Sequence, residues 1–332
     1  MQYPGGGNPV VQYYKGKFLT SDNRIATSND TNLLNNKYLY YSLLNNLKLI
    51  SSFYRGSGIK HPSMAAVLDM EIPIPCPNNP EKSLAIQTEI VRILDTFTTH
   101  TAELTAELTA ELTAREKQYN YYRDKLLTFE DGEVEWKALG EVILPTSNIN
   151  WRYTDRAYRY IDLTSVNREN NTIMETSEIT SKNAPSRAQK IVQTDDVIFA
   201  TTRPSQQRLC LISHEFSGEV ASTGYSVLRA KETEVLATWI YYCISSTEFK
   251  YYVTENESGS AYPAISDSKV KSFILPIPSL TEQTRIVTIL DKFDALTNSL
   301  CEGLPREIKL RQQQYEYYRD LLLSFPKPET TV

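Results

Sequence analysis

The sequence contains few of the residue patterns from which catalytic and metal sites are built. Its four cysteines have no C-x-x-C spacing and its three histidines are dispersed, which argues against a zinc site and indicates free thiols rather than disulfides. The patterns GxxxxGKS/T, GxSxG and HExxH are absent, although they mark phosphate-binding loops, serine hydrolases and zinc proteases. The pair Asp195–Asp196 is better explained by a turn before a strand than by a nuclease carboxylate cluster. We therefore expect no catalytic residue, no metal and no cofactor bound by this chain.

The sequence also lacks a long apolar run and an excess of positive charge. No apolar run approaches the roughly 20 residues of a membrane span, and the first residues, MQYPGGGNPV, have no signal-peptide character. We expect a cytoplasmic protein with no membrane partner. The net charge of -5 argues against a generic polybasic nucleic-acid binder, but it permits basic residues that gather on one face. The length of 332 residues is enough for two or three domains.

What the sequence does contain is a long stretch that occurs twice. Residues 87–129 read QTEIVRILDTFTTHTAELTAELTAELTAREKQYNYYRDKLLTF, and residues 283–325 repeat the pattern 196 positions later without a gap. Apolar residues at spacings of three and four predict a helix in each copy. Ten positions that alternate by four and three from Ile90 are identical in the two copies, whereas most of the positions between them diverge. This shared seam predicts that the two helices pair as a coiled coil. Its apolar members are Ile90, Leu94, Phe97, Leu104 and Leu108 in the first copy, and Ile286, Leu290, Phe293, Leu300 and Leu304 in the second.

The rest of the chain predicts an α+β fold in which globular segments alternate with the long helices. We expect a partial first globular domain over residues 1–76, a helix over 81–130, a second, complete domain over 131–278, a helix over 280–325 and a flexible tail over 326–332. Each globular segment ends with a Tyr-Tyr helix, a Gly/Ser loop and a proline-bracketed strand, EIPIPCP in the first and FILPIP in the second. Two short strands are also expected around Lys15–Gly16. Pro305 stands where the first copy has Thr109, so the second long helix is expected to be kinked or in two pieces.

Basic, amide and aromatic residues gather in three stretches of the second globular segment. Arg and Gln read guanine and adenine edges, and Thr and Lys serve phosphates. Pro204 and Ser205 place the last stretch at a loop tip, where recognition residues usually lie; the alternative is a solvated polar loop. The candidates for contact with DNA are Trp151, Arg152 and Arg156, then Arg187, Gln189 and Lys190, then Thr201, Arg203, Gln206, Gln207 and Arg208.

Several unusual motifs occur in a fixed order, namely IPIPCPNNPEKSLAIQTEIVRILDTF, the TAEL tetrapeptides, KQYNYYRDKLL, GEVEWKALGE and QQYEYYRDLLLSFPKPE. With these motifs the chain resembles the specificity (S) subunit of type I restriction-modification enzymes. The resemblance is greatest to the IC group, whose central region carries TAEL repeats. By this resemblance we expect the chain to be N-terminally truncated, with about half of the first recognition domain missing. The resemblance covers both long helices, the GEVEW segment and, more loosely, both globular segments.

The resemblance implies two target recognition domains held apart by two antiparallel helices, each domain reading half of a bipartite site in double-stranded DNA. It implies a non-catalytic subunit that assembles with two modification (methyltransferase) subunits, which use S-adenosylmethionine, and with restriction subunits, which use ATP and Mg. An alternative is a truncated subunit that self-associates through its helices as a structural or regulatory module. An autonomous methyltransferase or nuclease is poorly supported, because the sequence has neither a glycine-rich cofactor motif nor an NPPY-type motif.

The TAEL repeats at residues 101–112 lead to a hypothesis about spacing. A helix of about 43 residues spans roughly 60 Å, and each four-residue repeat rotates it by about 40° and lengthens it by about 6 Å. One base pair turns DNA by about 35° and lengthens it by about 3.4 Å. The rotations agree closely, so one repeat is expected to change the spacing of the half-sites by about one base pair.

Overall fold

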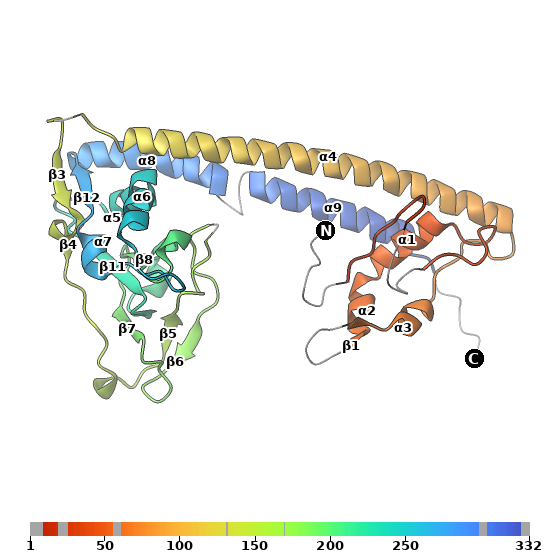
Figure 1. Cartoon of the computed structure of the whole chain (residues 1–332), viewed down its shortest axis with the longest axis horizontal. Coiled ribbons are helices and arrows are strands. Elements are labelled where there is room, and N and C mark those ends of the chain that lie inside the picture. The colour runs from red at the N-terminus through yellow and green to blue at the C-terminus, as the bar shows by residue number, and fades with distance from the viewer. Residues whose placement is uncertain are drawn as a thin grey trace. The chain divides into compact units, whose positions relative to one another are not determined.

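The structure is a computed structural model that describes residues 9–18, 26–55, 61–130, 132–168, 170–298 and 304–326. It divides into two compact units, which we treat separately (Figure 1). Unit 1 comprises residues 1–108 and 307–332, and unit 2 comprises residues 109–306. The longest helix, α4 (Pro80–Leu126), contributes its first part to unit 1 and its last part to unit 2. Helices and antiparallel sheets are both present, so the predicted α+β class is confirmed.

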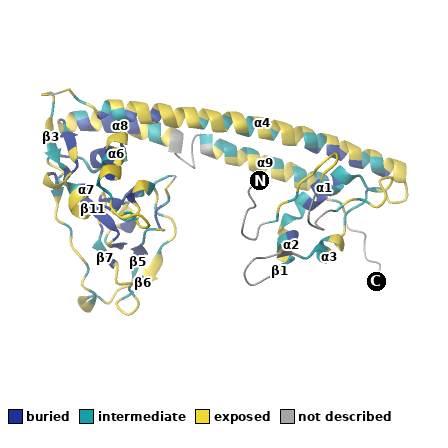
Figure 2. Cartoon of the chain, viewed as in Figure 1, coloured by how far each residue is buried: buried dark blue, intermediate teal, exposed yellow. Residues whose placement is uncertain are grey.

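Unit 2 contains two four-stranded sheets, ordered β6-β5-β10-β7 and β4-β11-β8-β9, and a two-stranded sheet, β12-β3. The strands are β3 (Glu135–Ala138), β4 (Ile143–Leu144), β5 (Tyr158–Ile161), β6 (Ser177–Ile179), β7 (Ala188–Ile191), β8 (Val197–Ala200), β9 (Leu209–Leu211), β10 (Val220–Ser222), β11 (Tyr225–Ala230) and β12 (Ile274–Ile277). The helices are η1 (Leu139–Glu141), η2 (Trp151–Tyr153), η3 (Pro204–Gln206), η4 (His214–Phe216), α5 (Ala237–Ser245), α6 (Thr247–Asn256), α7 (Asp267–Lys271) and α8 (Leu280–Asn298). Helix α5 packs on the sheet that contains β8 and β9 and forms with it the largest apolar core (Figure 2).

The acidic pair before β8 has a structural role. Asp195 has a φ of 66° and forms the turn before the strand. Asp196 is buried and accepts hydrogen bonds from Arg229 Nε at 2.8 Å and Nη2 at 2.7 Å. The hydrogen bond to Asp196 raises the pKa of Arg229. The pair therefore anchors β8 to β11, and the predicted turn is confirmed.

Unit 1 is smaller and mostly helical. Its elements are α1 (Asn36–Asn45), α2 (Leu47–Ser52), β1 (Tyr54–Arg55), β2 (His61–Pro62), α3 (Met64–Leu68), the first part of α4 and most of α9 (Leu304–Leu323). Its core joins α1 to both long helices through Tyr38, Tyr41, Ile90, Leu94 and Leu323.

Each long helix carries, in its first turns, a buried glutamine that holds the preceding globular segment. Gln87 Oε1 accepts a hydrogen bond from Asn35 N at 2.9 Å, and its Nε2 donates to Leu33 O at 2.9 Å. The equivalent bonds in unit 2 join Gln283 to Leu236 N at 2.9 Å and Glu234 O at 3.0 Å. A buried amide requires such partners, so each glutamine fixes where the segment meets its helix. We call these contacts the glutamine clamps.

Two further contacts recur in both units. Tyr41 donates to Asp95 Oδ1 at 2.6 Å, and its counterpart Tyr242 donates to Asp291 Oδ1 at 2.5 Å. An aromatic side chain also binds a proline carbonyl in each unit: Tyr38 Oη donates to Pro73 O at 2.8 Å, and Trp239 Nε1 donates to Pro276 O at 2.9 Å. The sequence repeat is therefore a repeat of specific polar contacts upstream of the long helices as well as along them.

The two copies of the long helix pair in antiparallel fashion within each unit. Phe97 stacks on Tyr318 in unit 1 with ring centroids 5.5 Å apart, and Phe293 stacks on Tyr122 in unit 2 at 5.9 Å. Because the two phenylalanines and the two tyrosines are each 196 positions apart, this is one contact made twice. The predicted seam residues divide into three groups: Ile90, Leu94, Ile286 and Leu290 are buried, Phe97, Phe293, Leu104, Leu108 and Leu304 are more exposed, and Leu300 lies outside the described residues.

The described residues give two helices in the second copy, α8, which ends at Asn298, and α9, which begins at Leu304 and has Pro305 in its first turn; residues 299–303, where the predicted interruption falls, lie outside the described part of the chain. Proline in a first helical turn removes an N–H that has no intrahelical acceptor. The strand predicted over EIPIPCP is wrong, since residues 71–77 form no strand. The counterpart, β12, is a strand because it pairs with β3, and the part of unit 1 that the structure describes has no such partner. The strands predicted around Lys15–Gly16 do not form within residues 9–18 either. The expected tail lies outside the described residues beyond position 326.

The glutamine clamp predicts a large loss of stability on substitution. In Gln283→Ala, the half-buried Leu236 N–H and Glu234 C=O lose their partner, so unit 2 should be destabilised by about 1–3 kcal/mol. All three tryptophans lie in unit 2, and urea titration of tryptophan fluorescence therefore follows this unit. The control is Gln118→Ala, at an exposed glutamine that accepts a bond from Arg115 on the surface. Equal midpoints for the two variants would show that the clamp contributes little.

Candidate nucleic-acid interface

The loop between β8 and β9 holds an exposed arginine in an unfavourable backbone conformation. Arg203 and Gln207 have φ values of 50° and 49°, and the left-handed region costs a non-glycine residue about 1–2 kcal/mol. The loop is fixed by a 2.7 Å bond from Arg203 N to Pro263 O. The Arg203 guanidinium lies 5.2 Å from the ring centroid of Tyr262, which is 72% exposed. Strained backbone that presents exposed polar side chains is a feature of functional sites.

A tight turn between β10 and β11 joins this loop to strand β7. Thr201 donates from both N (2.8 Å) and Oγ1 (2.9 Å) to Gly224 O. On the other side, the exposed Thr223 donates from its N to Arg187 O at 2.8 Å. A side chain at Gly224 would meet the Leu163 side chain at 3.2 Å, so glycine permits this close approach. Two threonines and Arg187 are thereby brought beside the Arg203 loop.

The aromatic residue Trp151 anchors the short helix η2 against β7. Its Nε1 donates to Ala188 O at 2.9 Å, and its ring meets the edge of Tyr158 with centroids 5.6 Å apart. Arg152 and Tyr153 follow it in η2 and are exposed, Tyr153 by 84%. Trp151 therefore fixes η2 against β7, and its two neighbours, Arg152 and Tyr153, face solvent.

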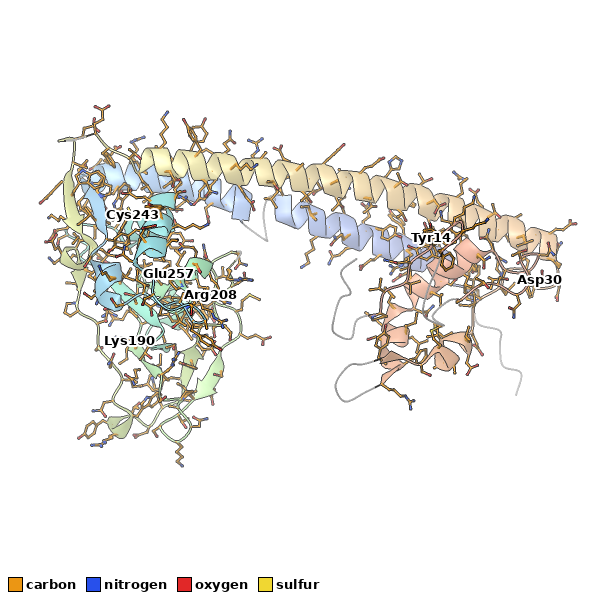
Figure 3. The ribbon with its side chains drawn as sticks, viewed as in Figure 1. Tyr14, Asp30, Lys190, Arg208, Cys243 and Glu257 are labelled. Atoms are coloured by element: carbon orange, nitrogen blue, oxygen red, sulfur yellow. The ribbon has the colours of Figure 1, made fainter. Side chains whose placement is uncertain are left out.

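Several of the residues predicted to bind DNA are engaged within the protein. Arg208 donates from Nη1 to Leu163 O at 2.9 Å and Val166 O at 2.8 Å. Arg156 donates to Gly218 O and lies 3.9 Å from the ring centroid of Tyr158. The remaining cases are amides and a lysine: Gln207 Nε2 donates to Pro204 O, Gln206 Oε1 accepts from Arg208, and Lys190 is half-buried in β7 (Figure 3). In their described positions these side chains hold loops and strands together.

The charge around these residues shifts two pKa values. A hydrogen bond with Thr154, and then the Arg156 guanidinium, lowers the pKa of Tyr158. Burial alone would raise the pKa of Asp267, but its contacts with Lys271 and Ser226 and the charge of Lys190 lower it. Asp267 thus remains ionised beside Lys190 and offsets part of that lysine's charge.

The contacts described above link one row of residues, which we call the recognition face. Its exposed members are Arg152, Tyr153, Arg187, Gln189, Thr223, Arg203 and Tyr262, and Thr201 is half-buried among them. Tyr153, Thr223 and Tyr262 were missed by sequence reasoning. For Tyr262 a signal existed, an aromatic residue among Gly, Ser and Pro in SGSAYP. The row contains three arginines and no acidic residue, so positive charge gathers here in a chain of net charge -5.

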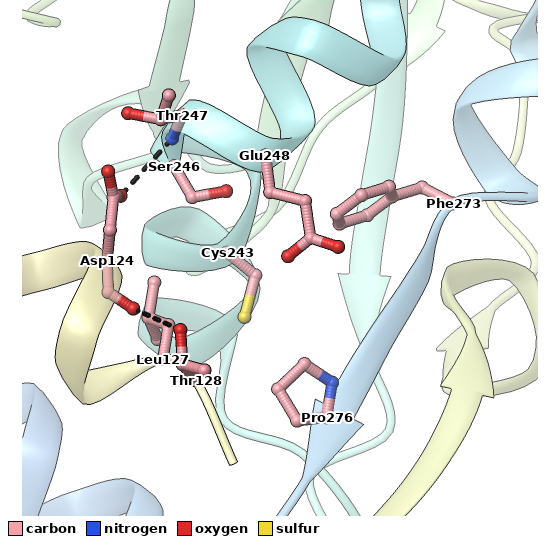
Figure 4. A pocket seen from close by; sticks show the side chains of 9 residues that line it. All are labelled: Asp124, Leu127, Thr128, Cys243, Ser246, Thr247, Glu248, Phe273 and Pro276. Atoms are coloured by element: carbon pink, nitrogen blue, oxygen red, sulfur yellow. Dashed lines mark hydrogen bonds between the residues drawn. The ribbon is translucent and has the colours of Figure 1, made fainter. Parts of the chain in front are cut away.

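A pocket in unit 2 lies between the end of α4, α6 and β12 (Figure 4). Asp124 Oδ1 accepts from Thr247 N at 3.2 Å and so caps α6 from α4. Burial raises the pKa of the Cys243 thiol well above its usual range, which keeps it protonated and unreactive. The pocket therefore lies where α4, α6 and β12 pack against one another. Within the described ranges, no group of three His, Cys, Asp or Glu residues is placed to hold a metal.

In the part of the chain that the structure describes, no helix has both the length and the apolar character needed to cross a bilayer.

Comparison with known proteins identifies matches along most of the chain. The family model described as the type I restriction modification DNA specificity domain matches residues 6–114 and 133–310. The EcoR124I/EcoR124II specificity subunit of Escherichia coli is 44% identical over 324 residues, which are 95% of this chain and 77% of that protein. A type I restriction enzyme specificity subunit of Haemophilus influenzae is 31% identical over 332 residues, which cover 96% of this chain and 79% of the relative.

Solved structures also match. The HsdS subunit from Thermoanaerobacter tengcongensis is 27% identical with a TM-score of 0.46, and the match covers 62% of this chain and 52% of that one. The S subunit from M. genitalium is 16% identical with a TM-score of 0.45, covering 90% and 75%. The chain thus spans about half the length of the first of these structures and three quarters of the second.

The geometry predicts different consequences for two arginines of one loop. Arg208→Ala leaves two carbonyl oxygens without their donor and should lower the stability of unit 2 by about 1–3 kcal/mol. Arg203→Ala removes an exposed side chain and should change stability by no more than about 0.5 kcal/mol. Urea unfolding followed by tryptophan fluorescence measures both. A larger loss for Arg203→Ala than for Arg208→Ala would contradict this division.

Proposed function

We propose, from the premise that the chain belongs to the type I restriction-modification DNA specificity family, that its recognition face reads one half of a DNA target. The chain is the specificity subunit of a type I restriction-modification complex, recognises target DNA within that complex and is itself non-catalytic. The proposal concerns which residues perform this recognition.

The observation that carries the proposal is the pairing of Arg203 with Tyr262 at the tip of a strained loop. An arginine held at such a tip can donate two parallel hydrogen bonds to guanine O6 and N7 in the major groove. Arg187 and Thr223 supply donors of the kind that bind phosphates, and Gln189 carries an amide suited to adenine. Thr201, whose N–H and hydroxyl both donate to Gly224 O, holds the turn that presents Thr223. Arg208 and Arg156 bind the protein's own backbone and hold the loops of the recognition face in place. We assign the same structural role to Lys190, Gln206 and Gln207.

The finer architecture is part of the proposal. The chain is an IC-like subunit in which the long helices pair as an antiparallel coiled coil and separate two recognition domains. The three TAEL repeats support the subgroup, and the recurrence of the Phe–Tyr contact in each unit supports the antiparallel pairing. In unit 1, the described strands are only the two-residue β1 and β2, so we assign most of the sequence reading to unit 2.

The partners are also proposed. The chain acts in the cytoplasm as a scaffold for two modification subunits, which bind S-adenosylmethionine, and for restriction subunits, which use ATP and Mg. Self-association through the seam is the less favoured arrangement, because Ile90 and Leu94 are already buried against unit 1's own residues, and Ile286 and Leu290 against those of unit 2.

Loss of the Arg203 side chain should change recognition without changing assembly. We expect Arg203→Ala, or Tyr262→Ala, to relax the half-site read by unit 2 and to weaken binding about 10- to 100-fold, since a bidentate contact contributes about 1–3 kcal/mol of discrimination. Methylome sequencing of cells that carry the variant with its modification subunits measures specificity, and gel shift of the purified complex measures affinity. The control is Arg285→Ala, which removes an equal charge from an α8 arginine paired with Glu282. An unchanged methylation motif and affinity for Arg203→Ala would refute the assignment.

The spacing hypothesis gives a separate prediction. Deletion of residues 105–108 removes one repeat and should shorten the spacer between half-sites by about one base pair, because the helix and DNA rotations then still agree. The matched control replaces the same four residues with alanines, which keeps the length of α4 and should keep the spacer. Mapping of the methylated sites decides the question, and an unchanged spacer after the deletion would exclude the helix as a ruler.

A further inference from the structure

Helix α6 connects the end of α4 to the recognition face. It begins at Thr247 beside the last turns of α4, packs against η3 and ends at Asn256. The chain then enters the turn 258–264, which carries Tyr262. All of these segments belong to unit 2. Because the turn continues from α6, a displacement of this helix would move the aromatic partner of Arg203.

The first turn of α6 is held by the Arg123–Asp124 pair of α4. Asp124 Oδ1 accepts a hydrogen bond from Thr247 N at 3.2 Å (Figure 4), and the Ser246 side chain accepts one from Phe249 N at 3.1 Å. Arg123 is buried and donates to the same carboxylate oxygen from Nε at 3.0 Å and from Nη2 at 2.8 Å. A carboxylate fixed in this way is a second cap for α6, supplied by another helix, and its negative charge suits a helix N-terminus.

The same pair of residues recurs at a helix junction in unit 1. Arg319 and Asp320 stand 196 positions after Arg123 and Asp124. Arg319 Nε donates to Asn45 Oδ1 at 3.2 Å, where α1 ends and α2 follows. The recurrence indicates that the Arg–Asp pair is matched to the junction between two short helices and is not a general surface charge.

The other end of α6 is joined to the loop of Arg203 by backbone hydrogen bonds. Ser258 and Ala264 exchange two bonds of 2.9 Å, which close the turn after the helix. Pro263 O in this turn accepts the 2.7 Å bond from Arg203 N, and Tyr262 is its neighbour. The position of the Tyr262 ring therefore follows the C-terminal end of α6.

Between its two ends, α6 is packed on β8 by apolar side chains. Phe249 is fully buried and meets Phe199 edge-on with ring centroids 5.1 Å apart, and Val253 is also fully buried. Burial of apolar surface is non-directional, so this packing holds α6 against the sheet. Hydrogen bonds are directional, and the cap from Asp124 therefore defines where α6 lies along its own axis.

We propose that Asp124 is a positioning residue for the recognition face. Held by Arg123, it sets the axial position of α6 and, through the turn 258–264, the position of the Tyr262 ring beside Arg203. The inference rests on the proposed function of Arg203. It adds that the sequence read by unit 2 depends on a residue of the long helix α4, which itself contributes no group to the recognition face.

Amide hydrogen exchange of the full chain tests the positioning step without DNA. Thr247→Pro removes the N–H that Asp124 binds, and proline suits a first helical position that follows extended backbone, as at Ser246 with φ -68° and ψ 159°. Thr247→Ala is the matched control, because it removes the hydroxyl and keeps the N–H. Thr247→Pro and Asp124→Ala should each accelerate exchange of the Arg203 amide about fivefold or more, the factor to which loss of a helix cap corresponds. Amides that pair β8 with β11, and the Arg203 amide in Thr247→Ala, should keep their rates.

Sequence discrimination by the complex with its modification subunits tests the consequence for recognition. Affinity is measured for duplexes with the methylation motif and for duplexes changed at the base pair that Arg203→Ala relaxes. Asp124→Ala and Thr247→Pro should each lower the ratio of these affinities about fivefold. Glu116→Ala removes an exposed acidic residue of α4 and should leave the ratio unchanged. In the Arg203→Ala background, Asp124→Ala should cause no further loss, because its effect passes through that loop.

Three results would each overturn the proposal. The first is unchanged exchange of the Arg203 amide in both Thr247→Pro and Asp124→Ala. The second is an equal acceleration of the amides between β8 and β11, which would indicate general destabilisation. The third is an equal loss of discrimination with and without the Arg203 side chain. If Arg203→Ala relaxes no base pair, the proposed function fails, and the exchange measurement alone then decides whether Asp124 positions the loop.

Discussion

The glutamine clamps are the contacts on which the rest of the structure depends. An amide side chain without exposed surface costs several kcal/mol unless its donors and acceptor are satisfied, and Gln87 and Gln283 are satisfied by the backbone before α1 and α5. A slip of one residue would rotate either glutamine about 100° around its helix and remove it from those partners. In unit 2, the clamp positions α5, α5 supports the sheet of β8 and β9, and that sheet carries the loop of Arg203. The orientation of the recognition face thus originates at the start of α8.

Sequence patterns revealed those parts of the molecule that depend on local or repeated information. The helix period is visible within a short window, and the identical seam positions are visible once the two copies are compared; together they predicted α4 and the pairing of the two copies. The strand predicted for the EIPIP segment was wrong for a physical reason. A strand needs a hydrogen-bonded partner, and no property of the segment itself reveals whether one is present. Even the Tyr-Tyr helices, expected as continuous, divide into α1 with α2 and α5 with α6.

The candidate site shows a different limit of prediction from the sequence. Arg203 and Arg208 have the same chemistry and lie in the same loop, but one faces solvent and the other binds the carbonyls of Leu163 and Val166. That difference arises from a contact across more than forty residues of sequence, as does the approach of Tyr262 to Arg203. The net charge of -5 does not decide how much affinity counterion release would give, because that depends on the phosphates that local Lys and Arg residues neutralise. The positions of individual arginines therefore matter more than the charge of the whole chain, and those positions are fixed by contacts distant in sequence.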